Sequence, residues 1–462
     1  MNKKIVVIGA GISGLTTAYL LSKKGFDVTV LEKNNSVGGS IETVFENGFL
    51  FDRGPNSALE TTPVIARLIR ELKLEPELLY ASKQANKRYI LRDNKLHALP
   101  MSPPGLIKTK LFSTKAKFRL MAEPFIGRSN DGYYQSLAEF VKRRLGQEFL
   151  DYAINPFVAG VYAGRPEDLS VKSAFPKLYA LEEKYGGLII GTIRSIRERK
   201  KRAEVAKQSA KMLSFKNGMA VLPNAIEKYF GSNVLLSAEV TSVDKNEAGY
   251  SVFYKQNGSV NKIDCDIVLS TIPSYAASGI FTKYDKDFKT HADAIYYPPV
   301  LVYYLVYNRR DIKQDLDGFG FLIPAKENKS FLGALWSSII FSDRTDESKA
   351  SFTLFVGGSR NPEFVKEERT TLLTKVRKEF EALMSITSDP IFTSERFWEK
   401  AIPQYTLGYV EHERFFDEFE KKNPGLLISG NFRGGISVGD CVKNADLVCD
   451  KINVEFTMHN VQ

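Results

Sequence analysis

Three glycines near the N-terminus have a spacing that suits phosphate binding. Gly9, Gly11 and Gly14 form the pattern G-x-G-x-x-G, and Glu32 follows 18 residues after Gly14. The first glycine allows a tight turn, the second lets a pyrophosphate approach the backbone, and the third lets a helix pack on a strand. A carboxylate at Glu32 can accept hydrogen bonds from a ribose diol, which disfavours NADP. The pattern therefore predicts a dinucleotide site.

Two further glycine-containing segments follow Glu32. Gly38 and Gly39 form a pair six residues later, and residues 51–55 (Phe-Asp-Arg-Gly-Pro) contain a D-x-G-P turn. Together with the first glycine pattern, they resemble the dinucleotide motif of the amine oxidase-like flavoproteins, whose GG loop wraps the FAD pyrophosphate. The resemblance implies FAD rather than NAD as the cofactor.

A second glycine-rich turn, residues 430–439, lies near the other end of the chain, between an expected strand and a final helix. Backbone amides in such a turn can meet the ribityl chain and the electron-rich edge of a flavin ring. Because the two turns bracket about 420 residues, we expect a discontinuous FAD domain with the substrate domain in the middle of the chain.

A β-α-β unit must position the first turn. Residues 5–8 and 28–31 are short apolar runs, which is typical of strands buried on both faces. The residues between them have helical spacing, and Gly25 is a stop signal for that helix. Parallel strands joined in this way require a right-handed crossover. The sequence thus predicts an α/β fold of the Rossmann type.

The rest of the chain gives coarser signals. Residues 61–205 are expected to be mainly helical, with a capping box at Ser136–Glu139. Residues 234–272 predict a small antiparallel sheet that ends in a buried strand at 267–270. Residues 300–307 alternate, with the valines and Tyr304 on one face, and further strands are expected at 319–323, 331–336 and 352–356. Asn361-Pro362 is expected to open a helix.

Composition excludes several classes of protein. The chain has 462 residues, 43% hydrophobic and 26% charged, which is ordinary for a folded globular protein. It has no run of about 18 apolar residues and no N-terminal signal segment, so we expect a cytoplasmic protein without a membrane span. Three cysteines without a CxxC pair fit a reducing compartment, and four histidines without ligand spacing argue against a metal enzyme.

Six stretches carry a more specific resemblance: residues 160–164 (GVYAG), 173–178 (SAFPKL), 318–324 (GFGFLIP), 355–360 (FVGGSR), 403–405 (PQY) and the 430–439 turn. Together they resemble the protoporphyrinogen oxidase family, the flavoenzymes of late haem biosynthesis. The resemblance covers most of the chain and looks closer to the plant and animal type than to a generic amine oxidase. A departure from the amine oxidase pattern is Ser40, where amine oxidases usually carry arginine after the GG pair.

The resemblance implies three domains. Residues 1–60, 206–273 and 396–455 would form the discontinuous FAD-binding domain, residues 61–95 and 274–395 an α+β substrate-binding domain, and residues 96–205 an inserted helical membrane-binding domain. It also implies the FAD contacts, which are Gly9, Gly11, Gly14, Glu32, Gly38, Gly39, Ser40, Gly54, Pro55, Asn56, Ser57, Val240, Trp398, Ile436, Ser437 and Val438.

The implied reaction is oxidation of protoporphyrinogen IX to protoporphyrin IX, six electrons in three flavin cycles, with O2 as acceptor. No catalytic acid or base is expected, because the protein need only bind, orient and keep the site dry. A wide apolar macrocycle with two propionates requires flat apolar walls and a cation. By resemblance, Arg88 pairs a propionate, Leu322, Leu335 and Phe355 form the walls, and Gly164 offers a backbone carbonyl.

Residues 101–128 mix cationic and bulky apolar side chains, including Phe112, Phe118 and Phe125. Such a mixture suits a segment that lies in the lipid headgroup layer. A helical subdomain with an apolar core and a basic outer face would have the same sequence pattern. The basic block at 194–211, whose net charge is +6, could add attraction to anionic lipid. We therefore expect a peripheral membrane protein, and the resemblance adds ferrochelatase and a second copy of the chain as partners.

Three alternatives remain open at this point. Coproporphyrinogen III, with four propionates, is a second substrate candidate, although one anchoring arginine favours the substrate with fewer carboxylates. An amine oxidase or carotenoid desaturase could use the same fold. A nucleic-acid-binding protein would rest on the net charge of +10 alone and would leave both glycine turns unexplained, so no nucleic-acid partner is expected.

Overall fold

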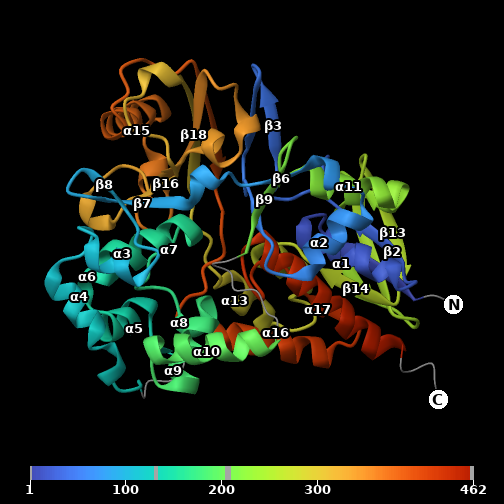
Figure 1. Ribbon diagram of the computed structural model, residues 1–462. Coiled ribbons are helices and arrows are strands. Elements are labelled where there is room, and N and C mark those ends of the chain that lie inside the picture. The colour runs from blue at the N-terminus through green and yellow to red at the C-terminus, as the bar shows by residue number, and fades with distance from the viewer. Residues whose placement is uncertain (1–2, 130–133, 203–209, 458–462) are drawn as a thin grey trace.

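The computed structural model describes residues 3–129, 134–202 and 210–457. A parallel five-stranded sheet forms the centre of one body, on the right in Figure 1. Its strands come from the beginning, the middle and the end of the chain. The strand order is β10 (Val234–Leu235), β2 (Asp27–Leu31), β1 (Lys4–Ile8), β14 (Ile267–Ser270) and β20 (Leu426–Ile428).

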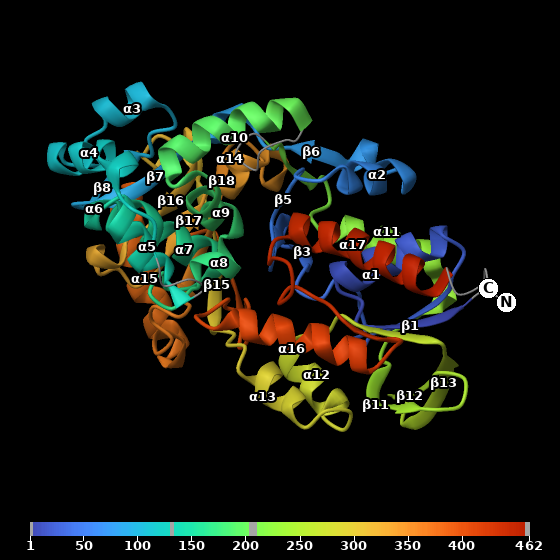
Figure 2. The same ribbon diagram turned by 90° about the horizontal axis from the view of Figure 1, so that it is seen from below.

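The predicted β-α-β unit is confirmed. Helix α1 (Ile12–Lys23) connects β1 to β2, which pair in parallel, and Gly25 beyond its end has a φ of +90°. The last helix, α17 (Val438–Thr457), lies alongside α1, as Figure 2 shows from below. Helices α2 (Pro63–Glu71) and α11 (Val221–Phe230) contribute to the same apolar core as α1.

A mixed seven-stranded sheet forms the centre of a second body, at the upper left of Figure 1. The expected alternation along residues 300–307 is confirmed, but both faces are buried, because α15 (Arg369–Met384) covers the side of Leu301 and Tyr303. The strand order is β19 (Phe392–Trp398), β15 (Val300–Asn308), β18 (Lys349–Gly357), β17 (Gly333–Leu335), β16 (Gly318–Leu322), β7 (Lys87–Arg92) and β8 (Lys95–Ala98).

Two expectations about secondary structure are wrong. Residues 78–98 are not helical. Strand β6 (Leu78–Tyr80) pairs with β9 (Met212–Phe215) and β7 pairs with β16, partners far away in sequence that local patterns do not reveal. Strands β7 and β8 form a hairpin around Asp93-Asn94, a local turn that the helical prediction overlooked. The helix expected at Asn361-Pro362 begins instead at Arg369, because the Glu368 carboxylate accepts the N–H groups of Thr370 and Thr371 and caps it there.

The remaining strands form smaller sheets. Strands β11 (Glu239–Lys245), β12 (Tyr250–Gln256) and β13 (Ser259–Cys265) make the predicted antiparallel sheet. Strand β9 (Met212–Phe215) pairs with β5 (Ala58–Leu59) and β6, and β3 (Thr43–Glu46) forms a hairpin with β4 (Phe49–Asp52). Helices α12 (Ser274–Phe281), α13 (Asp287–Asp293) and α16 (Tyr409–Lys422) pack together below the parallel sheet in Figure 2.

Residues 103–129 and 134–202 form a helical region at the lower left of Figure 1. The predicted capping box at Ser136 and Glu139 is present. The fully buried guanidinium of Arg144 forms ion pairs with Glu123 and Glu182, and these pairs link separate segments of this region. Its helices are α3 (Pro103–Lys108), α4 (Thr114–Met121), α5 (Leu137–Arg144), α6 (Gln147–Phe149), α7 (Asn155–Tyr162), α8 (Val171–Ala174), α9 (Pro176–Tyr185) and α10 (Leu188–Arg202).

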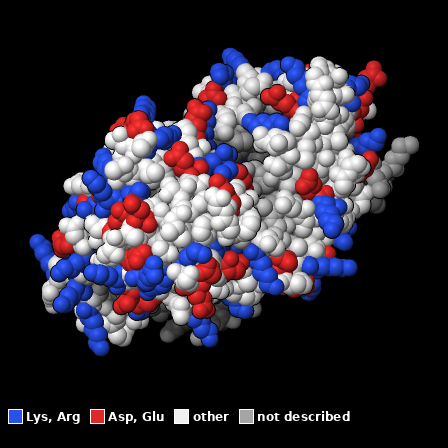
Figure 3. Space-filling view, turned by 90° about the horizontal axis from the view of Figure 1, so that it is seen from above, with Lys and Arg blue, Asp and Glu red and all other residues white. Residues whose placement is uncertain are grey.

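On the face seen in Figure 3, Lys and Arg side chains are interspersed with Asp and Glu side chains rather than gathered in one patch. Most of the basic block at 194–211 lies outside the described side chains. Within residues 3–129, 134–202 and 210–457, no helix combines the length and the apolar character that a bilayer crossing requires.

Candidate functional site: a dinucleotide cradle beside a flat sheet face

The first glycine turn has the geometry that its pattern predicts. Gly9 has a φ of +100°, a conformation that side chains rarely adopt, and a Cβ on Gly14 would collide with the Gly9 carbonyl. Gly11 precedes α1 and no side chain caps the helix there, so the first N–H groups of α1 remain available to an anion. A Cβ on Gly11 would meet no protein atom within 4 Å, so the protein leaves this position open.

Glu32 lies at the end of β2, next to this turn, and is buried. Its carboxylate accepts the N–H of Ala10 at 2.8 Å and the N–H of Asn34 at 2.9 Å. A carboxylate has about four acceptor positions, so two remain for hydroxyl donors. Val240 lies close by, because the N–H of Ala238, two residues earlier, bonds to the Glu32 carbonyl at 2.8 Å.

The GG loop lies directly on the first turn. The N–H of Gly38 donates to the Ala10 carbonyl at 2.8 Å, and a Cβ on Gly39 would stand 3.3 Å from the Gly11 Cα. The loop continues to Ser40. A Cβ on Gly54 would collide with the Ser40 carbonyl, so the D-x-G-P turn lies against this loop. The structure therefore brings together the first turn, the GG loop and the D-x-G-P turn, three segments that the sequence only suggested were neighbours.

The seven-stranded sheet holds the D-x-G-P turn in place. Tyr304 donates its hydroxyl to the Asp52 carbonyl at 2.9 Å, and the Trp398 indole N–H donates to the Arg53 carbonyl at 2.8 Å. Arg344 also reaches the buried Asp52 carboxylate, at 3.4 Å. Burial raises the pKa of Asp52, and the Arg344 charge opposes that rise. Trp398 is thus in contact with the turn that carries Gly54 to Ser57.

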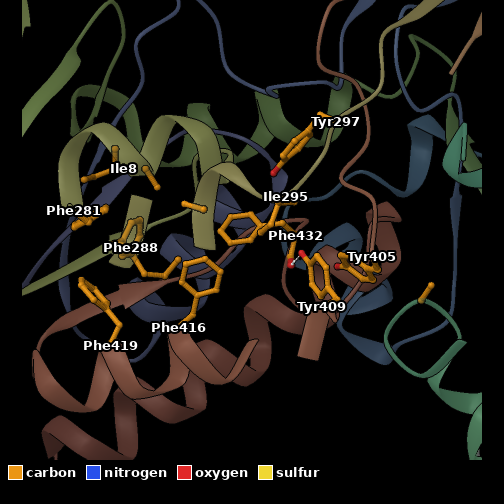
Figure 4. Packing of buried hydrophobic residues seen from close by; sticks show 14 of the residues in the cluster. Ile8, Phe281, Phe288, Ile295, Tyr297, Tyr405, Tyr409, Phe416, Phe419 and Phe432 are labelled. Atoms are coloured by element: carbon orange, nitrogen blue, oxygen red, sulfur yellow. Dashed lines mark hydrogen bonds between the residues drawn. The ribbon is translucent and has the colours of Figure 1, made fainter. Parts of the chain in front are cut away.

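The C-terminal glycine turn is positioned by two tyrosines (Figure 4). Tyr409 donates its hydroxyl to the Phe432 carbonyl, and Tyr405 donates to the Asn431 carbonyl at 2.8 Å and accepts the Gly435 N–H at 2.9 Å. Both tyrosines are almost completely buried, so the turn is held from one side by a rigid aromatic surface.

The turn ends where α17 begins, beside the start of α1. Ser437 caps α17 by accepting the Asp440 N–H at 3.1 Å. Cys441, in the first turn of α17, donates its thiol to the Gly435 carbonyl at 3.8 Å, and α17 packs along α1. The predicted contacts Ile436, Ser437 and Val438 are therefore close to the first glycine turn, although more than 400 residues separate them in sequence.

These residues fit FAD. The uncapped start of α1 and the open position at Gly11 suit a pyrophosphate, and Glu32 retains acceptor positions for a ribose. The positive-φ glycines of the GG loop allow the backbone to approach closely, since no side chain intervenes. When bound here, FAD supplies hydride acceptance, a chemistry that no side chain of the chain can provide.

The predicted substrate residues meet on one face of the seven-stranded sheet. Strand pairing places Arg88 beside Gly320, and Gly320 beside Leu335. The adjacent row contains Ile90, Leu322, Gly333, Phe355 and Val302. Because residues paired across strands point to the same face, Arg88, Leu322, Leu335 and Phe355 share a face, and Tyr304, which holds the D-x-G-P turn, shares it too.

Leu322, Leu335 and Phe355 are each partly buried, whereas Arg88 is exposed. Gly333 lies between Leu322 and Phe355, and a Cβ there would stand 3.1 Å from the Leu322 Cδ2, so Leu322 leans across a position without a side chain. The result is an apolar surface with a guanidinium at its border. This arrangement can hold a flat apolar molecule that carries a carboxylate.

Gly164 is not part of this face. It follows α7, and a Cβ on it would collide with the Gln404 amide oxygen. Gly160, four residues earlier and inside α7, contacts Leu322 instead. The helical repeat could have identified Gly160. A helix that begins at Asn155-Pro156 places residue 160 on the side that faces the sheet. Phe319, whose ring contacts Arg88, was also missed.

Most of the chain matches one family of flavoproteins. The profile described as "Flavin containing amine oxidoreductase" matches residues 12–453, so the chain belongs to that family and is a flavin-dependent oxidoreductase that uses FAD. Within the family its relatives include protoporphyrinogen oxidase 2, chloroplastic/mitochondrial, of Arabidopsis thaliana, 33% identical over 97% of this chain and 94% of the relative. The mitochondrial protoporphyrinogen oxidase of Nicotiana tabacum is 34% identical over 96% and 94%.

More distant matches agree on the fold. The coproporphyrinogen III oxidase of Bacillus subtilis is 27% identical over 96% of both chains. A solved structure from Exiguobacterium sp. 255-15, provisionally assigned as a protoporphyrinogen oxidase, has a TM-score of 0.80 at 22% identity, covering 98% of this chain and 99% of its own. The protein therefore has the mixed α/β fold of the amine oxidase-like flavoproteins, as the sequence predicted.

Proposed function

We propose that this protein oxidises protoporphyrinogen IX to protoporphyrin IX with O2 as the acceptor. The observation that carries the proposal is the shared sheet face, on which one exposed guanidinium borders an apolar surface formed by Leu322, Leu335 and Phe355. That face adjoins the D-x-G-P turn of the FAD cradle through Tyr304. The printed names of the relatives from Arabidopsis and tobacco support the same substrate.

The overall reaction removes six electrons and six protons from the porphyrinogen and reduces three O2 to three H2O2. The chain's own residues bind and orient the macrocycle, because a bridge carbon must lie close to the flavin for hydride transfer. Arg88 would hold one propionate, and the apolar face would exclude water from the reacting carbon. No side chain of this face is assigned as an acid or base.

The test is turnover by the purified, flavin-loaded protein. We expect oxidation of protoporphyrinogen IX, followed by porphyrin fluorescence, with consumption of one O2 for each pair of electrons. Coproporphyrinogen III serves as the comparison, since it has four propionates rather than two. A flavin-loaded protein that oxidises neither porphyrinogen, but oxidises an amine, would contradict the proposal.

Coproporphyrinogen III oxidation is the second candidate, because relatives from Bacillus subtilis and Staphylococcus aureus carry that name. It would need more than one cation at the border of the sheet face. Arg396 lies at the far end of the Leu322 row, but its guanidinium already stacks on Trp398 and pairs with Glu42. The charge arrangement therefore favours the substrate with two propionates.

We also propose the three-domain division and a peripheral attachment to the cytoplasmic face of a membrane through the helical region. Its 101–128 segment exposes five large apolar side chains, Met101, Ile107, Phe118, Met121 and Phe125, among lysines and arginines. This combination suits the headgroup layer. Phe112, expected with them, is instead buried and stacks on Phe149 at 4.1 Å. Ferrochelatase and a second copy of the chain remain proposed partners.

A further inference from the structure

Three consecutive residues of β7 divide their polar groups between the two faces of the sheet. Lys87 forms an ion pair with Asp317, and Tyr89 donates its hydroxyl to the same carboxylate at 2.6 Å. Arg88, between them, points to the opposite face. Its guanidinium has neither an ion pair nor a hydrogen bond to any residue in the described part of the chain. The carboxylate at this end of β16 is therefore occupied by the neighbours of Arg88.

The contact that Arg88 does make is aromatic. Its guanidinium carbon lies 5.4 Å from the centre of the Phe319 ring, within the range of a cation–π interaction. Phe319 is partly buried and packs with Leu335 in a small cluster that also contains Ile340 and Phe341. The ring is thus fixed by its surroundings, whereas the arginine side chain is exposed.

An irregularity in β16 explains how Phe319 reaches this face. Strict alternation would point Phe319 away from the face of Gly320 and Leu322. The pairing of β16 with β7 shifts register between Gly318 and Gly320, so Phe319 is the additional residue of a bulge. Its carbonyl accepts the Trp336 N–H at 3.0 Å, which anchors the bulged backbone. A bulge redirects a side chain, here onto the face that carries Arg88.

We propose that Phe319 is a positioning residue that holds the Arg88 guanidinium at the border of the sheet face while leaving its N–H groups free for an external carboxylate. An acidic side chain could also hold the guanidinium in place. It would, however, accept hydrogen bonds from the N–H groups that an external carboxylate needs. An aromatic ring orients the guanidinium through its face and uses no N–H donor. The inference rests on the proposed function, since it assigns the carboxylate to the substrate.

The experiment is a double-mutant cycle measured by binding, so that it does not depend on turnover. The probes are protoporphyrin IX and its dimethyl ester, titrated into flavin-loaded protein and followed by porphyrin fluorescence. Phe319→Leu should raise the Kd of the dicarboxylate roughly two- to fivefold, the size of an exposed cation–π contact, and leave the Kd of the ester unchanged. In an Arg88→Ala background the same change should have no further effect. Phe319→Tyr should restore wild-type affinity.

Phe321→Leu is the matched control, because Phe321 lies two residues along the same strand in the core on the opposite face. It should lower the Tm without changing the preference for the dicarboxylate. If Phe319→Leu loses flavin or fails to fold, Phe319→Met replaces it, with Tm and flavin content measured for each variant. The inference would be overturned if Phe319→Leu weakened binding of the dimethyl ester as much as binding of the dicarboxylate. It would also be overturned if Phe319→Leu weakened dicarboxylate binding equally with and without Arg88. Failure of the wild type to oxidise protoporphyrinogen would instead overturn the proposed function, because the cycle uses the product alone.

Discussion

Gly160 in α7 lies against Leu322 in β16, and a Cβ on Gly160 would stand 2.5 Å from the Leu322 Cδ2. The distance between the helix and the sheet face is therefore set by the absence of a side chain. Arg360 reinforces this junction, because its guanidinium donates to the Ile323 carbonyl at 2.7 Å and to the Asn155 side chain at 2.9 Å.

Gly160→Ala should disturb the sheet face more than the fold. Alanine is favoured over glycine within a helix by about 0.5–1 kcal/mol, and overpacking costs about 1–3 kcal/mol, so the Tm should fall slightly at most. Leu322 must turn away, which should raise the Kd for protoporphyrin severalfold at unchanged flavin content. Adding Leu322→Val, which removes the colliding methyl group, should recover part of the affinity. If Gly160→Ala lowers the affinity for protoporphyrin just as much in a protein that already carries Leu322→Val, a collision with Leu322 is not the cause.

Gly11→Trp should abolish FAD binding in a protein that still folds. Gly11 has a φ of −70° and a ψ of 171°, which any residue can adopt, so the backbone is not strained by the change. The indole would occupy the open position above the turn, where the pyrophosphate is expected. Visible absorbance reports the flavin and circular dichroism reports the fold. Gly127→Trp, at another glycine with open surroundings, is the control, and a fully yellow Gly11 variant would refute the site.

Replacing Phe118 and Phe125 by Ser should release the protein from membranes. Their side chains are 66% and 88% exposed, and inserting each one would contribute roughly 1.5–3 kcal/mol if it is fully buried in lipid. Co-sedimentation with anionic vesicles measures the partition. Phe112→Ser should behave differently, because Phe112 is buried: it should lower the Tm and leave vesicle binding unchanged. Equal partition of the double variant and the wild type would favour an internal role for the segment.

The ion pairs of Glu182 should make stability depend on acid pH. Burial acts to raise the pKa of Glu182, but hydrogen bonds from Arg143 and Arg144 outweigh it, and the pKa lies below the usual value. A depressed carboxyl pKa gives stability that is present above the unfolded pKa, about 4.3, and is lost as the pH falls through the folded pKa. Urea unfolding at pH 7 and at pH 4 measures the difference.

Glu182→Gln supplies the comparison for that measurement. It leaves the buried Arg144 paired with Glu123 alone, so it should destabilise the protein by about 1.5–3 kcal/mol at pH 7, the size of a lost hydrogen bond to a charged group. Its unfolding free energy should change less than that of the wild type between pH 7 and pH 4. Parallel pH profiles for the two proteins would show that Glu182 is not the group responsible.

Local patterns revealed the cofactor cradle better than the substrate face. The first glycine turn and Glu32 sit in one short β-α-β unit, so strand, helix and turn signals together identified them. The face of Arg88 and Leu322 depends instead on pairing between β7 and β16, which are more than 200 residues apart. A bulge at Phe319 sets the register there, and the glycines on either side of it, Gly318 and Gly320, are typical of a bulge but do not show which strand it pairs with.

The same limit explains why Gly160 was not predicted to lie against the sheet face. Residues 160–164 contain a glycine at each end, and only helical phase decides which of them faces Leu322. Phe112 and Phe118 likewise have the same residue type and the same basic neighbours. One is buried and the other exposed, because Phe149, from another helix, covers only the first.

The position of the C-terminal glycine turn beside α1 has a consequence for synthesis of the protein. Strand β20, the turn and α17 are among the last segments made, yet β20 completes the parallel sheet and α17 covers α1. The nascent chain can form the β-α-β unit early, but it cannot enclose a dinucleotide until residues beyond 438 have left the ribosome. We therefore expect cofactor loading to be a late step, and a chain that terminates before β20 would leave the ribosome without the helix that packs on α1.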